Sequence, residues 1–137
     1  NADGSLDSSF GTAGLVTTSF GGTDDRGRSV VLQSDGKIVV AGRSNVSGTF
    51  DFALARYNAN GSLDTSFAPN GLLITSFGIG SNDQGLSAVL QANGRIIVAG
   101  TSSLSGTFDF ALARHLIPSI TISQSARDLR AKYFLLQ

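Results

Sequence analysis

An internal repeat constrains the fold of this chain more than any other feature. The ten residues SGTFDFALAR occur twice without change, at positions 47–56 and 105–114. Two further segments recur around them: DGSLDSSF at 3–10 matches NGSLDTSF at 60–67, and LQSDGKIVVAG at 32–42 matches LQANGRIIVAG at 90–100. Repetition of this kind is the signature of an architecture in which each copy is one supersecondary unit stacked on its neighbour. Two copies of one structural unit explain why the two ten-residue segments are identical. Two copies of a catalytic site are the alternative explanation.

Each copy contains four short segments rich in β-branched and apolar residues, which predicts four strands per copy. They span 15–20, 29–33, 37–42 and 50–57 in the first copy, and 72–77, 87–91, 95–100 and 108–114 in the second. The turns SDG and ANG lie between the second and third strands and favour tight hairpins, because Asp-Gly and Asn-Gly accept positive φ. The composition agrees, since all 10 acidic residues are Asp and 17 residues are Gly, types that favour turns over helix interiors.

The pattern of apolar residues indicates how the strands are covered. Residues 30–32 and 38–41 are apolar on both faces, which is typical of strands buried on both sides. In the last strand Phe50, Phe52 and Leu54 share a bulky face, and the residues between them form a small face. Sheets that stack face to face need such large-against-small surfaces.

We therefore predict an all-β fold of two four-stranded antiparallel, blade-like repeats that resemble β-propeller blades, at 1–58 and 59–116, plus a short C-terminal tail at 117–137. Two blades are too few for a closed propeller, which needs about four to eight. The chain is then a piece of a longer array, a subunit that joins others, or a two-sheet sandwich.

The tail has mixed signals. Pro118 ends the last strand, and SITIS at 119–123 alternates like a strand. Residues 125–136 have the spacing of a helix, but YFLLQ at 133–137 is also typical of a strand. We interpret the tail as a cap over the last repeat. An arm that docks on a neighbouring subunit is the alternative.

Three motifs in this order, DGSLDSSFG, LQSDGKIVVAG and DFALARYNANGSLDTSF, resemble the delta-60 repeat, a bacterial β-propeller-like repeat of unknown function. The resemblance covers residues 3–114, and the second copy departs from the pattern at RHLIP, 114–118. It implies two copies of a propeller-like unit, a secreted or cell-surface location, and no catalytic residues to carry over.

Few residues offer catalytic chemistry. The chain has no Cys and a single histidine, His115, which stands where the first copy has Tyr57. The Gly-x-Ser-x-Gly pattern of a nucleophile elbow does not occur. We predict that the protein is not an enzyme and has no catalytic, cofactor-binding or metal-binding residues.

A formal net charge of zero argues against a nucleic-acid partner. No apolar run approaches the roughly 20 residues of a membrane span, which argues against membrane insertion.

Two repeated acidic positions lie in loops. The segments TDDRG at 23–27 and SNDQG at 81–85 place Asp25 and Asp83 at equivalent points. We interpret both as turn caps that accept hydrogen bonds from backbone N–H groups. A calcium ion held by these carboxylates and nearby carbonyls is the alternative.

The repeated motif also carries charges: Asp51 and Arg56 recur as Asp109 and Arg114. Asp51 and Arg56 project to opposite faces of one strand. We therefore predict that Asp51 forms an ion pair with an Arg of a neighbouring strand or blade. A sugar site repeated in each blade is the alternative, weakened because the chain has no Trp and only two Tyr.

These observations predict a non-catalytic, extracellular or surface structural module that assembles with itself, or with further repeats of a parent chain, into a larger propeller or polymer. One alternative is a glycan- or calcium-binding module that uses the equivalent loops. Another is a fragment of an enzyme on a propeller scaffold, with its site on the central channel.

Overall fold

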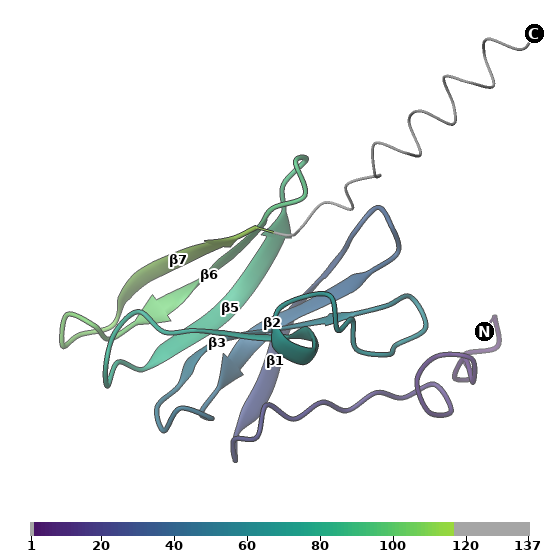
Figure 1. Ribbon diagram of the computed structural model, residues 1–137, viewed down its shortest axis with the longest axis horizontal. Helices are drawn as coiled ribbons and strands as arrows, with labels where there is room; N and C mark the ends of the chain where they lie inside the picture. The colour runs from purple at the N-terminus through teal and green to yellow at the C-terminus, as the bar shows by residue number, and fades with distance from the viewer. Residues whose placement is uncertain (1, 117–137) are drawn as a thin grey trace, which may run out of the picture.

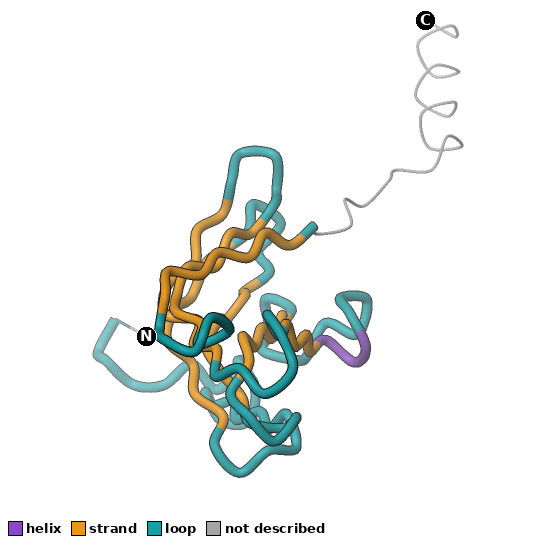
Figure 2. Tube along the Cα trace, turned by 90° about the vertical axis from the view of Figure 1, so that its left-hand side faces the viewer, coloured by secondary structure: helices purple, strands orange, loops and turns teal. Residues whose placement is uncertain are grey.

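The computed structural model describes residues 2–116, which form two antiparallel sheets stacked face to face (Figure 1). The strand order is β1-β2-β3-β4 in the first sheet and β5-β6-β7 in the second. The elements are β1 (Asp25–Leu32), β2 (Ile38–Ser44), β3 (Asp51–Tyr57), a short 3-10 helix η1 (Pro69–Gly71), β4 (Leu72–Thr75), β5 (Asp83–Leu90), β6 (Ile96–Ser102) and β7 (Asp109–His115). The predicted all-β class is confirmed, and loops join the strands at both ends of the stack (Figure 2).

The two central hairpins form where the turn residues require them. Gly36 and Gly94 have φ of 83° and 81°, a left-handed conformation that glycine adopts without steric cost. Their N–H groups close the turns by donating to the carbonyls of Gln33 and Gln91. The hairpin prediction for SDG and ANG is therefore confirmed.

The fourth strand of the first sheet comes from the second sequence copy. β4 pairs with β3, so the sheet extends across the predicted boundary between residues 58 and 59. The equivalent segment 15–20 is not a strand, and its only ladder contact is an isolated bridge from Leu15 to Thr12. The prediction of a strand at 15–20 is wrong, because the described residues offer this segment no free sheet edge of a preceding repeat.

All four strands predicted for the second copy are present, as β4, β5, β6 and β7, but β4 belongs to the first sheet, so the second sheet has three strands within the described residues. No segment that follows β7 within residues 2–116 adds a fourth strand to this sheet. The tail at 117–137, with its predicted cap or docking role, lies outside the described residues. Among residues 2–116, no helix is long and apolar enough to cross a bilayer.

The core lies between the two sheets. The first sheet contributes Val39, Ala41, Phe52 and Leu54, and the second contributes Ala88, Ile96, Val98 and Ala111. The ring of Phe52 packs edge-on against Phe77, with centroids 5.0 Å apart. The bulky face of β3 therefore meets small and branched residues of the next sheet, as the alternation of bulky and small residues predicted.

Candidate functional site

The duplicated motif occupies two different environments. In β3, Phe52 and Leu54 are 0% exposed, whereas their counterparts Phe110 and Leu112 in β7 are 101% and 67% exposed. β3 lies between β2 and β4 and is covered by the second sheet. β7 is an edge strand, and among residues 2–116 nothing covers its bulky face (Figure 1). The exposed apolar side chains make this face a candidate interaction surface.

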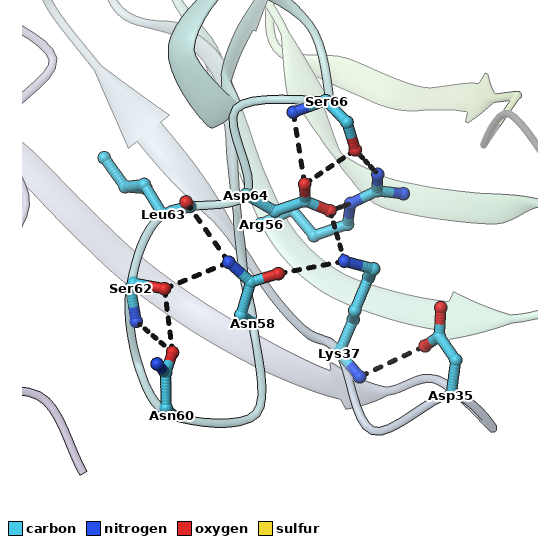
Figure 3. Close-up of polar contacts among 9 residues, drawn as sticks. All are labelled: Asp35, Lys37, Arg56, Asn58, Asn60, Ser62, Leu63, Asp64 and Ser66. Atoms are coloured by element: carbon cyan, nitrogen blue, oxygen red, sulfur yellow. Dashed lines mark hydrogen bonds and ion pairs between the residues drawn. The ribbon is translucent and has the colours of Figure 1, made fainter.

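A charged cluster fixes the end of β3 to the loop before β4 (Figure 3). Asp64 Oδ2 lies 2.8 Å from Arg56 Nε and 2.8 Å from Lys37 Nζ. Asp64 Oδ1 accepts hydrogen bonds from the backbone N–H and the hydroxyl of Ser66, at 3.1 and 2.6 Å. The Arg56 guanidinium also stacks over the ring of Phe67, 4.7 Å from its centroid. One carboxylate therefore ties together the first hairpin, the third strand and the loop that carries the next repeat motif.

The cluster is buried, so its charges must compensate one another. Asp64 is 5% exposed and Arg56 is 3% exposed. Burial raises the pKa of Asp64, but the contacts with Lys37 and Ser66 and the charge of Arg56 outweigh it and hold that pKa far below its usual value. The carboxylate stays ionised, as a buried Arg requires of its partner.

Sequence reasoning missed this cluster, although a signal was present. Asp64 belongs to the repeated motif L-D-x-S-F, in which Asp7 is its counterpart, and Lys37 corresponds to Arg95. An acidic and a basic position that recur together at the repeat period are candidates for one ion pair.

The predicted ion pair of Asp51 with an Arg is wrong. Asp51 is 1% exposed and accepts a hydrogen bond from the hydroxyl of Ser47, at the other end of its own hairpin loop. Asp109 accepts the same bond from Ser105. The Asp is thus repeated because it braces the β2–β3 and β6–β7 loops, while Arg56 finds its partner, Asp64, outside the motif.

Asp25 and Asp83 act as backbone caps. Asp25 Oδ2 accepts the N–H of Phe20 at 2.9 Å, and Asp83 Oδ2 accepts the N–H of Phe77 at 2.8 Å. Asp83 also accepts the hydroxyl of Ser81 at 2.9 Å. Each carboxylate therefore fixes the end of the extended segment that precedes the first strand of a sheet, which confirms their interpretation as turn caps. No group of three or more His, Cys, Asp or Glu side chains within residues 2–116 is placed to hold a metal ion.

The single histidine lies in β7, where it pairs with Ile96 across the ladder. Burial lowers the pKa of His115. Its counterpart Tyr57 donates a hydrogen bond to Thr18 at 2.8 Å and so holds the 15–20 segment against the first sheet.

The fold is that of an all-β repeat protein in which the first sheet takes its fourth strand from the second sequence copy. Residues 33–67 and 91–114 match the family model described as "Domain of unknown function (DUF5122) beta-propeller". These two segments are therefore similar to a propeller-type repeat whose function is unknown. The narrower assignment to the delta-60 repeat, with two copies, stays a prediction. No curated protein and no solved structure matches the chain.

Proposed function

We propose that this chain is a non-catalytic structural repeat module that assembles, with copies of itself or with further repeats, into a larger propeller or polymer. One observation carries the proposal: the bulky residues of the identical sequence are fully buried in β3 and exposed in β7. The face that the first sheet buries against the second is presented again by the second sheet. A module that ends in a surface already used for stacking is suited to stack again.

The apolar content of this face favours association. Phe108, Phe110 and Leu112 are 60%, 101% and 67% exposed. Burial of one such side chain stabilises a contact by about 1.5–3 kcal/mol. The opposite end of the stack presents apolar residues too, since Val30 and Leu32 are 61% and 69% exposed. Two different surfaces at opposite ends make a head-to-tail contact, which closes into a ring or extends into a filament.

The repeated polar residues support a structural rather than a chemical role. Within the described residues, Arg56 and Asp64 pair with each other, and Asp83 accepts a hydrogen bond from the backbone N–H of Phe77. A secreted or cell-surface location is part of the proposal and rests on the resemblance to the delta-60 repeat.

Sedimentation of the full chain over a range of concentrations tests the proposal. We expect a mass above that of one chain, which falls on dilution. Phe110→Ser should weaken association about ten- to hundredfold, from the burial energy of one Phe side chain. Ile79→Ser is the matched control, because Ile79 is 108% exposed and lies in the loop where the second copy has its extra residue. A monomer at all concentrations, or equal effects of both substitutions, would contradict the proposal.

A further inference from the structure

We propose that residues 3–20 of one copy of this chain complete the second sheet of another copy. In this junction residues 15–18 add to β7 as its fourth strand, and Asp7 pairs with Arg114 and Arg95. The inference rests on the proposed self-assembly and specifies the partner segment and its contacts.

The first step is the strand. β4 pairs antiparallel with β3 in the register Phe52↔Thr75, Ala53↔Ile74, Leu54↔Leu73 and Ala55↔Leu72. β7 repeats the sequence DFALAR of β3, and LVTT at 15–18 corresponds to LLIT in β4. Within residues 2–116, β7 has a partner on one side only, so its other edge is free. An extended segment that adds to such an edge gains main-chain hydrogen bonds. The repeat predicts the register Phe110↔Thr18, Ala111↔Thr17, Leu112↔Val16 and Ala113↔Leu15.

The second step is the ion pair. Arg114 and Arg95 occupy the places of Arg56 and Lys37, but neither has an acidic partner among the described residues. Asp7 occupies the place of Asp64 and is already arranged like it: its Oδ1 accepts the N–H and the hydroxyl of Ser9 at 2.9 and 2.6 Å. In residues 2–116 the Asp7 carboxylate contacts no cation. Arg114, Arg95 and Asp7 are thus the counterparts of Arg56, Lys37 and Asp64, the three residues that form the cluster in Figure 3.

The third step is aromatic packing. Phe67 stacks under Arg56, and Phe77 packs against Phe52. Their counterparts in the 3–20 segment are Phe10 and Phe20. The junction therefore places Phe10 under Arg114 and Phe20 against Phe110, the most exposed ring of the open face. Strand, charge and ring contacts all follow from one superposition of the repeat.

The order of the layers requires a second copy. Val16, Thr18 and Phe20 line a groove with Ala53 and Ala55, on the small face of the first sheet. The bulky face of that sheet packs on the second sheet, whose own bulky face is open. The 15–20 segment and the open face therefore lie at opposite ends of the stack, and both stay in place when another copy docks.

Two contacts of the internal junction are not repeated. Asn58, which accepts a hydrogen bond from Lys37 at 2.9 Å, corresponds to Leu116. Arg43, which donates to Gln84 at 2.8 Å, corresponds to Thr101. We therefore expect the junction between copies to be weaker than the one within a copy, so that association responds to dilution.

Cysteine cross-linking of full chains tests the register, because the native chain has no Cys. Val16→Cys and Leu112→Cys, made in separate chains with different tags and mixed, should form a disulfide between chains. Directly opposed residues of an antiparallel pair have Cα atoms about 4.5–5.5 Å apart, within disulfide range. Thr17→Cys mixed with Leu112→Cys is the control, since a shift of one residue points the thiol to the other face. Equal yields from both pairs, or none, would overturn the proposed register.

Charge reversal tests the ion pair by sedimentation. Asp7→Arg should raise the dissociation constant about tenfold or more, and adding Arg114→Asp to the same chain should recover part of the loss. Asp3→Arg is the control, because Asp3 is exposed and accepts the N–H and the hydroxyl of Ser5 as Asp7 does those of Ser9, but its counterpart Asn60 is not part of the ion pair. If the chain assembles but Asp7→Arg behaves like Asp3→Arg, and the cross-link is absent, this junction is wrong and the proposed function stands. A chain that never assembles refutes both.

Discussion

The buried carboxylate of Asp64 offers the sharpest test of how this fold is held together. Asp64→Asn removes the negative charge but keeps the side-chain oxygen that Ser66 binds. The chain itself shows that Asn suffices for that turn, because Asn60 accepts the N–H and the hydroxyl of Ser62 at 3.1 and 2.7 Å. The substitution therefore tests the negative charge of Asp64 separately from its hydrogen bonds to Ser66.

The expected cost follows from burial. The side chain of Arg56 is 4% exposed, and its Nε lies 2.8 Å from Asp64. Removing one partner of a buried pair leaves an uncompensated charge and typically costs about 3–5 kcal/mol. The free energy of unfolding of a domain is only about 5–15 kcal/mol in total. The substitution should therefore lower the urea midpoint strongly, measured by far-ultraviolet circular dichroism.

Asp7→Asn is the matched control. Asp7 sits in the same turn with Ser9 but is exposed and has no cation beside it in residues 2–116. In chains too dilute to associate, this substitution should leave the unfolding midpoint unchanged. If Asp64→Asn destabilises no more than Asp7→Asn, the central role of the buried ion pair is refuted.

The same pair predicts a pH dependence. The folded pKa of Asp64 lies below the usual value of 3.8, so the unfolded chain binds the proton first as the pH falls. The stability from this carboxylate is complete above that value and is lost as the pH drops below it. The difference in unfolding free energy between the native chain and Asp64→Asn should therefore shrink in acid, and a constant difference from pH 6 to pH 2 would contradict the assignment.

Other substitutions address the core, a close approach and the calcium alternative. Phe52→Ala should cost about 3–5 kcal/mol in urea unfolding, whereas Phe110→Ala, at the same place in the motif, should leave dilute chains unchanged. Gly100→Ala should destabilise by about 1–3 kcal/mol or more, because a Cβ there would lie 1.8 Å from the Gln84 carbonyl oxygen; an unchanged midpoint would refute that contact. Asp83→Asn should lower the melting temperature with or without calcium, and a calcium-dependent rise in the native chain that this substitution abolishes would contradict its role as a cap.

The local features of this protein were predictable from the sequence, because their causes are local. Asp-Gly and Asn-Gly set the two hairpin turns through the φ they permit. Alternation of large and small residues marked which face of the third strand packs against the next sheet. Asp25 and Asp83 were identified as caps because short acidic side chains in loops bind nearby N–H groups.

Burial and strand allocation depend on neighbours and were decided only by the tertiary structure. Nothing within FDFALAR distinguishes Phe52 from Phe110; one is covered by a sheet and the other is not. Leu72–Thr75 and its counterpart at 15–18 share two of four residues and the same place in the repeat, but only the first finds a free strand edge beside it. Arg56 pairs with Asp64 rather than with an Asp51-type partner, because the loop before β4 folds back onto the end of β3. The sequence thus determined the repeating unit, and the packing of units determined which surfaces are closed and which remain open.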